Sequence, residues 1–136
     1  MADDDANEMM LAAEVVSVLI VDDQAPFRLA ARAVLRRTEG FELVGEAADG
    51  DEAVELARQL LPGLVLMDIN MPTMNGIEAT RQIVAERPET TVFLCSTYQL
   101  SDLPPEAETS GAAAYVNKEE LAPALLVELW RERPTV

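Results

Sequence analysis

The clearest pattern in the chain lies at residues 64–68, where the apolar run Leu-Val-Leu-Met stops abruptly at Asp68. A short apolar run without polar alternation is typical of a strand buried on both faces, as the strands of parallel sheets are. Further segments that read as strands lie at residues 16–21, 41–47, 91–96 and 113–116. The chain is therefore predicted to contain five strands.

Helical patterns separate these strands. They predict a last helix that begins near Pro123 and three earlier helices, over residues 26–38, 50–61 and 76–87. Pro26 fits the first position of its helix, and Pro62 with Gly63 ends the next one. This alternation of strands and helices predicts a single α/β domain, which we place at residues 16–133.

One helix of this alternation is interrupted. It is expected within residues 100–110, where the chain carries Pro104 and Pro105. Because proline removes a backbone donor and disfavours helix in the residue before it, this helix can begin no earlier than about Leu103 and must be short.

The composition restricts the function. With 25 acidic and 10 basic residues, the chain carries a formal charge of −15, so this domain is not expected to bind nucleic acid directly. The absence of histidine removes imidazole catalysis and His-ligated metals. A single cysteine allows no internal disulfide and suits a reducing compartment, so we expect a cytoplasmic location.

The N-terminal residues 1–15 are acidic and are predicted to form a mobile tail. The stretch 9–21 is fairly apolar, but it contains Glu14, lacks a basic flank and runs into two Asp residues. It therefore fits neither a signal peptide nor a membrane span, and no membrane insertion is expected.

Polar residues follow four of the predicted strands: Asp22 with Asp23, Asp68, Ser96 and Lys118. The carboxyl ends of the strands in a parallel sheet meet at one edge, so we expect these side chains to converge. A loop Asp that caps the next helix is the alternative for Asp68, but that helix begins only near Gly76.

Three carboxylates packed together repel one another, and a hard divalent cation relieves the repulsion. Oxygen ligands without His or Cys point to Mg²⁺, Mn²⁺ or Ca²⁺. Asp23 and Asp68 are candidates for direct ligands, Asp22 for holding a bound water, and the main-chain carbonyl of Asn70 for a further oxygen.

A carboxylate at such a site can act as a nucleophile and form an acyl phosphate. Ser96 can donate a hydrogen bond to a phosphoryl oxygen, and Lys118 can pair with another. Lys118 is the only lysine in the chain beside nine arginines, which favours a role for a compact ammonium group at this position.

Over residues 17 to about 131, the chain resembles a bacterial response-regulator receiver domain. The segments that carry the resemblance are Val18–Asp23, Met67–Gly76, Leu94–Thr97, Gly111-Ala112 and Tyr115–Lys118. The run Ser96-Thr97-Tyr98 is similar to receivers of the NarL/LuxR-type group, and no output domain follows in this chain.

The resemblance implies a flavodoxin-like (βα)5 fold with a doubly wound parallel sheet of order 2-1-3-4-5. It implies transfer of a phosphoryl group from a sensor histidine kinase or a phosphotransfer protein to Asp68. Mg²⁺, with Mn²⁺ as a possible substitute, would be bound by Asp22, Asp23, Asp68 and the Asn70 carbonyl. Switching would involve Ser96 and Tyr115.

Two departures from the family pattern stand out. Glu119 follows Lys118 where receivers often carry proline, and Pro104-Pro105 alter the region that usually forms part of the output face. The downstream protein is not identified by the sequence, and the expected state is a monomer or a phosphorylation-dependent dimer.

Two groups of residues have predicted accessory roles. Arg28, Arg32 and Arg36 recur every fourth residue and are expected on the outer face of their helix, where Arg28 and Arg32 are candidates for kinase docking. Asn70 and Tyr98 lie two residues beyond Asp68 and Ser96 and are expected to control dephosphorylation, because neither is a carboxylate that activates water.

Several alternatives remain open at this stage. The chain is read as a stand-alone receiver, with the receiver half of a longer DNA-binding regulator as the second reading. A metal-dependent aspartyl-phosphate phosphatase would need an acid where Asn70 stands, and an FMN-binding flavodoxin would need a phosphate loop where Asp22-Asp23 stand. No enzymatic activity is expected beyond self-phosphorylation from phosphodonors and slow autodephosphorylation.

Overall fold

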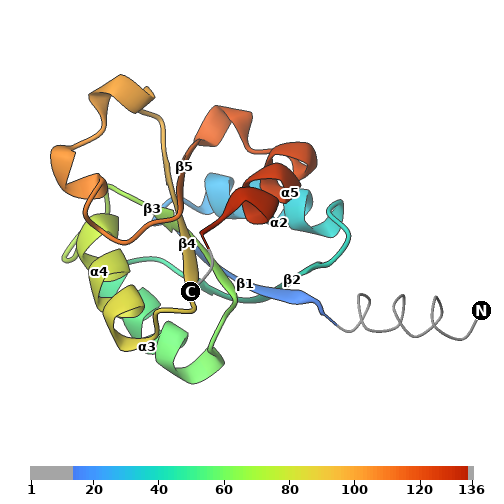
Figure 1. Cartoon of the computed structure of the whole chain (residues 1–136), viewed down its shortest axis with the longest axis horizontal. Coiled ribbons are helices and arrows are strands. Elements are labelled where there is room, and N and C mark those ends of the chain that lie inside the picture. Colours follow the sequence, from blue (N-terminus) through green and yellow to red (C-terminus); the bar gives the residue numbers. More distant parts are fainter. Residues whose placement is uncertain (1–13, 135–136) are drawn as a thin grey trace, which may run out of the picture.

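Five parallel strands form one sheet in a computed structural model that describes residues 14–134 (Figure 1). Their order is β2-β1-β3-β4-β5, as predicted. The strands are β1 (Val16–Val21), β2 (Phe41–Ala47), β3 (Leu64–Asp68), β4 (Thr91–Ser96) and β5 (Ala114–Asn117). Of the predicted tail, residues 1–13 lie outside the described part of the chain.

Two pairs of helices cover the two faces of the sheet (Figure 1). One face carries α2 (Ala25–Arg36) and α5 (Pro123–Glu132), and the other carries α3 (Gly50–Leu60) and α4 (Gly76–Glu86). Two of these helices have side-chain N-caps: the carboxylate of Asp49 accepts the N–H of Glu52, and the amide oxygen of Asn75 accepts the N–H of Glu78. Asn75 is thus the N-cap of α4, so Asp68 does not serve in that role.

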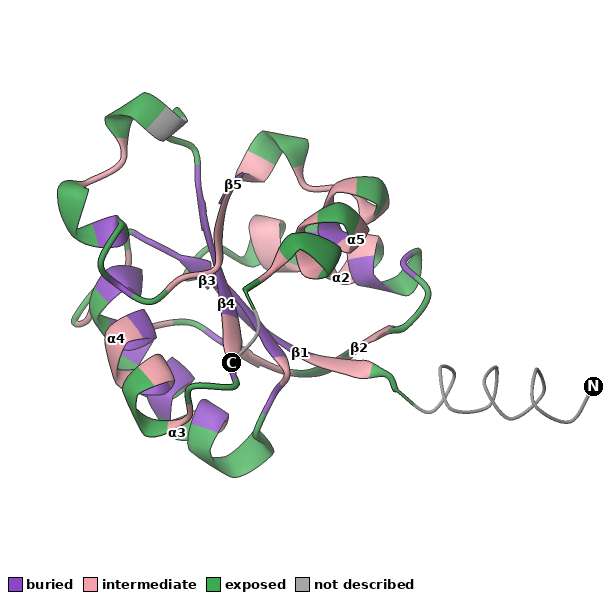
Figure 2. Cartoon of the chain, viewed as in Figure 1, coloured by how far each residue is buried: buried purple, intermediate pink, exposed green. Residues whose placement is uncertain are grey.

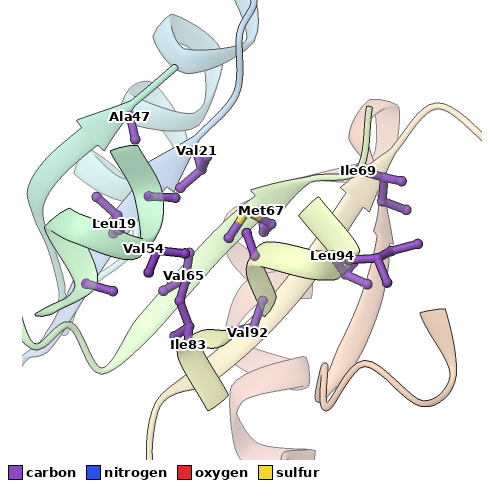
Figure 3. Packing of buried hydrophobic residues seen from close by; sticks show 14 of the residues in the cluster. Leu19, Val21, Ala47, Val54, Val65, Met67, Ile69, Ile83, Val92 and Leu94 are labelled. Carbon is purple, nitrogen blue, oxygen red and sulfur yellow. The ribbon is translucent and has the colours of Figure 1, made fainter. Parts of the chain in front are cut away.

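The core consists of two layers separated by the sheet. Alternate residues of a strand point to opposite faces, so Val65 and Met67 pack toward α3 and α4, whereas Leu64 and Leu66 pack toward α2 and α5. Figure 3 shows the first layer, and Figure 2 shows that burial is concentrated in the central strands and the inner faces of the helices. Strands buried on both faces explain the uninterrupted apolar run at residues 64–67.

The helix expected within residues 100–110 does not form as an α-helix. Within the described chain, β4 and β5 are joined through two single 3₁₀ turns, η1 (Leu100–Asp102) and η2 (Pro105–Ala107). Pro104 has an extended backbone, with ψ 141°, because the following proline disfavours the helical region. The proline pair therefore breaks the helix into turns, which is a stronger effect than the shortening predicted.

Strand β2 contains a bulge that changes which way its last residues face. Val18 pairs with Leu43, but the next residue, Leu19, pairs with Gly45, so Val44 is the extra residue. A one-residue shift exchanges the two faces of a strand. As a result Glu46 lies opposite Ile20, on the α2 side of the sheet.

No helix in the described residues is both long enough and apolar enough to cross a membrane.

Gly76 allows the first turn of α4 to pack against the end of β3. A Cβ atom at this position would overlap the main-chain oxygen of Asp68, and the Gly76 amide donates to the Ile69 carbonyl at 2.8 Å. We therefore expect Gly76→Ala to lower the free energy of unfolding by roughly 2–4 kcal/mol, measured by urea denaturation.

Gly63→Ala is the matched control for this prediction. A Cβ at Gly63 meets nothing closer than 3.5 Å, an ordinary contact with Val16. A loss in Gly76→Ala no larger than in Gly63→Ala would contradict the close-packing explanation.

Candidate functional site

Strand register brings the polar strand ends together at the carboxyl edge of the sheet. Val21 pairs with Met67, so Asp22 follows beside Asp68. On the other side Asp68 pairs with Cys95, and Ser96 pairs with Asn117, the residue before Lys118. One carboxylate oxygen from each of Asp22, Asp23 and Asp68 lies within 4.8 Å of the others, as the sequence pattern predicts.

Lys118 is the cation of this cluster. Its Nζ lies 2.6 Å from Asp22 Oδ2 and 3.1 Å from Asp68 Oδ1. The ammonium also lies 4.8 Å from the centre of the Phe27 ring, a cation–π arrangement. Burial lowers the pKa of Lys118, but the close ion pair with Asp22 and the charge of Asp68 outweigh it, so the net pKa is raised and the side chain stays charged.

Asp22 is fully buried and is held through several of its polar atoms. Its N–H donates to the Ala47 carbonyl at 3.0 Å, extending the pairing of β1 with β2, and its Oδ1 accepts the Gln24 N–H at 2.8 Å. Lys118 lies close to Oδ2, but among the described residues no donor is aligned with that atom as a hydrogen bond. Oδ2 therefore keeps capacity for a further positive partner.

Asp68 is buried, with 5% of its surface exposed, and this raises its pKa to about 6. Loss of hydration is the largest cause, and repulsion by Asp22 adds to it. Lys118 acts in the opposite direction without cancelling the effect. Asp68 is thus a carboxylate whose charged form is costly until another cation arrives.

The residues present fit a hard divalent cation. Three carboxylates and one ammonium leave about two net negative charges, and the donor set contains only oxygen. The buried Oδ2 of Asp22, which pairs with Lys118 at 2.6 Å but accepts no aligned hydrogen bond within the described chain, could take a second cationic partner. Asp23, the exposed member of the cluster, would supply a ligand that is open to solvent.

The loop after β3 carries Asn70 and ends at Gly76. The side-chain amide of Asn70 donates from Nδ2 to the Tyr98 hydroxyl at 3.0 Å, and this bond joins the loop to the segment after β4. Tyr98 is 41% exposed. The two residues predicted to control dephosphorylation are therefore in direct contact beside the site, while their role stays a prediction.

The two residues expected to act in switching lie on neighbouring strands. Ser96 is buried, and its hydroxyl accepts the Tyr98 N–H at 3.2 Å. The Tyr115 hydroxyl donates to the Ala107 carbonyl at 2.8 Å, in the turn that replaces the missing helix. Both side chains line one cleft of about 300 Å³ between β4, η1 and β5.

The arginines of α2 are arranged differently from the expectation. Arg36 is exposed, but Arg28 and Arg32 turn toward β2, where both pair with Glu46. The side chain of Arg32 is 38% exposed, whereas that of Arg28 is only 22% exposed, so the predicted outward placement is wrong for Arg28. The spacing of the basic residues along the helix carries no information about a carboxylate on a neighbouring strand. Their role in kinase docking stays a prediction.

Two residues at the site were missed by reasoning from sequence. Glu46 was unmarked because the bulge in β2, which sets its direction, leaves no pattern in the sequence. Phe27 was not marked either, because the cation that it contacts, Lys118, lies about 90 residues further along the chain.

Comparison with known proteins agrees with this geometry. The chain matches the family described as response regulator receiver domain over residues 18–130. The transcriptional regulatory protein PdtaR of Mycobacterium tuberculosis is 42% identical over 120 residues, which cover 85% of this chain and 58% of PdtaR. The chemotaxis protein CheY of Thermotoga maritima is 39% identical over 111 residues, which cover 82% of this chain and 91% of CheY.

Among solved structures, a two-component response regulator of the LuxR family from Aurantimonas has a TM-score of 0.77 at 34% identity, with 88% of both chains covered. The fold and the site together define a class of protein: doubly wound α/β domains with acidic residues and a lysine at the carboxyl edge of the sheet. The chain belongs to the response regulator receiver domain family of two-component systems. It spans about half the length of several regulators it matches, such as 47% of DegU from Brevibacillus brevis.

The raised pKa of Asp68 gives a testable dependence of stability on pH. Above about pH 6 the folded protein carries a costly charge that the unfolded chain tolerates, so stability falls as pH rises from about 4 to 6. In metal-free buffer at pH 7.5, Asp68→Asn should raise the free energy of unfolding by about 1–3 kcal/mol.

Urea denaturation of both proteins at pH 7.5 and pH 4 measures this gain. The gain should shrink toward pH 4, where wild-type Asp68 becomes neutral in the folded protein. An equal difference at both pH values would show that the ionisation of Asp68 is not its cause.

Proposed function

We propose that this chain is a phosphorylation-dependent signalling switch. It accepts a phosphoryl group on Asp68 from a histidine kinase or a phosphotransfer protein, with Mg²⁺ bound, and then presents an altered contact surface. Membership of the receiver family supports this function. The observation that carries it is the cluster of Asp22, Asp23 and Asp68 against Lys118 at one edge of the sheet.

The chemistry follows from the charges at the site. An oxygen of the Asp68 carboxylate attacks the phosphorus of a phosphohistidine, and a P–O bond forms as the P–N bond breaks. The imidazole leaves with the bonding electron pair and takes up a proton. Lys118, already beside Asp68 Oδ1, pairs with a phosphoryl oxygen, and the buried Ser96 hydroxyl donates to another.

Asp22, Asp23 and Asp68, with the Asn70 carbonyl, would hold Mg²⁺. The bound ion supplies charge neutralisation for the phosphoryl oxygens. Without it, two net negative charges at the site would repel the incoming anion. Burial of Asp22 and Asp68 strengthens this dependence, because water screens the repulsion less inside the protein.

The switch itself involves the cleft beside the site. A hydrogen bond from Ser96 to the phosphoryl group would compete with its present contact to Tyr98 N–H. The Tyr115 side chain lines the same cleft and is anchored to Ala107 through one hydrogen bond. A movement of Ser96 would change the shape of this cleft, and Tyr115 would pass the change to the 3₁₀ turn that contains Ala107.

A second candidate function concerns a longer protein. PdtaR, a transcriptional regulatory protein, extends well beyond the region that it shares with this chain, which covers 58% of it. The 42% identity supports the receiver half of a longer, DNA-binding transcriptional regulator as the second candidate. No enzymatic activity beyond self-phosphorylation and autodephosphorylation is included in either candidate.

Phosphorylation can be tested directly by intact mass. Incubation with acetyl phosphate and Mg²⁺ should add one phosphoryl group to the wild type and none to Asp68→Asn, which keeps the shape but lacks the nucleophile. Chelation of Mg²⁺ should abolish the addition. Labelling of Asp68→Asn to the wild-type extent would overturn the assignment of the phosphoacceptor.

The lifetime of the phosphorylated form provides a separate test. Tyr98, fixed to Asn70 by its hydroxyl, covers the approach of water to Asp68, so Tyr98→Ala should speed decay several-fold. Tyr98→Phe keeps the ring and removes the hydrogen bond, so its decay rate should lie between those of the wild type and Tyr98→Ala. Decay is followed by mass after removal of the donor.

Equal decay in the wild type and Tyr98→Ala would assign Tyr98 to packing alone. Mg²⁺ affinity should be the same in all three proteins, because Tyr98 supplies no ligand.

A further inference from the structure

We infer that Arg28 is a positioning residue for the acidic site, anchored by Glu46, and that it fixes the main chain from which Asp22 and Asp23 project. The inference deepens the proposed function and rests on it, since the site is taken to bind Mg²⁺. Arg28 touches neither the nucleophile nor the phosphoryl position, and it acts through Asp22.

Arg28 contacts the backbone of the site. Its Nη1 donates to the main-chain carbonyl of Asp22 at 2.7 Å, while its Nε lies 3.4 Å from Glu46 Oε1. The side chains of Arg28 and Glu46 are each only 22% exposed, so this is a partly desolvated contact rather than a solvated surface pair. One guanidinium therefore links the ends of β1 and β2.

Glu46 is itself fixed from two sides. Arg32 binds it through two parallel bonds, Nε to Oε2 at 2.6 Å and Nη2 to Oε1 at 3.0 Å. Paired N–H donors of this kind restrict both distance and angle. Glu46 reaches this place because the bulge at Val44 turns it toward α2, and regular pairing would direct it to the opposite face.

As a result, both the N–H and the carbonyl group of Asp22 are hydrogen-bonded. Its N–H is bound to Ala47, its carbonyl to Arg28, and its Oδ1 to the Gln24 N–H. Asp23 is exposed and directly follows the carbonyl that Arg28 holds, so the direction of its peptide depends on this contact. Loss of a residue that hydrogen-bonds to the ligands of a metal typically lowers the affinity of the site for that metal 10- to 100-fold.

Charge alone predicts the opposite effect. A guanidinium near carboxylates repels a dication, so removal of its charge should tighten Mg²⁺ binding. Loss of positioning should weaken binding. The sign of the change in affinity therefore separates the two roles.

The test measures Mg²⁺ affinity by calorimetric titration without any phosphodonor. Arg28→Met should weaken binding about tenfold, and Arg28→Lys, which keeps the charge but lacks the fork, should also weaken it. Arg58→Met is the control for the loss of one arginine charge, because Arg58 on α3 binds Glu86 on α4, at 2.9 and 2.6 Å, and contacts no group of the acidic site. Its Mg²⁺ affinity should stay within twofold of wild type.

Glu46→Gln tests the anchor. It should weaken Mg²⁺ binding in the wild-type background and change it less than twofold in Arg28→Met, since Glu46 acts through Arg28. Backbone-amide NMR spectra establish that each variant is folded at the temperature of the titration.

Two results would overturn the inference while the proposed function stands: unchanged or tighter Mg²⁺ binding by folded Arg28→Met, or equal losses in Arg28→Met and Arg58→Met. Absence of Mg²⁺ binding by the wild type would overturn the proposed function itself. Asp23→Ala, which removes a ligand, gives the reference for a lost site.

Discussion

Repulsion among three carboxylates is the constraint on which the site depends. Asp22 and Asp68 are buried, where water screens little of their mutual charge, and Lys118 offsets only part of it. The pKa of Asp68 is raised first by its burial and then by repulsion from Asp22, and Lys118 does not cancel the two effects. A site of this kind gains its affinity for cations from unfavourable electrostatics in the free protein, so stability and function act against each other at the same atoms.

The fold restrains this repulsion with groups that never enter the site. Asp22 is held by hydrogen bonds from and to β2, α2 and the following loop, and Gly76 allows α4 to approach the carbonyl of Asp68. Strand β2 contributes no ligand, yet its bulge directs Glu46 toward the arginines of α2. The edge strand β2 thus helps to fix Asp22 at the end of β1, through Ala47 and through Glu46 with Arg28.

Much of this arrangement was predictable from sequence, because the apolar runs that end at Asp22, Asp68 and Ser96 reflect strands buried on both faces. Parallel strands then require those ends to meet. The position of Glu46 was not predictable, since a single extra residue in β2 reverses the facing and leaves no periodic signal. Nor was the loss of the helix before β5, where Pro104-Pro105 had suggested a shorter helix rather than separate turns.

The broken connection between β4 and β5 has a consequence for local stability. Hydrogen bonds of the two 3₁₀ turns span only three residues, as from Ala107 N–H to the Pro104 carbonyl, and each can open without disturbing the next. Segments of this kind exchange their amide hydrogens through small fluctuations, at a free energy well below that of global unfolding. Beside the rigid edge that holds the carboxylates, the receiver therefore carries a segment of low local stability, which a partner can reorder at low energetic cost.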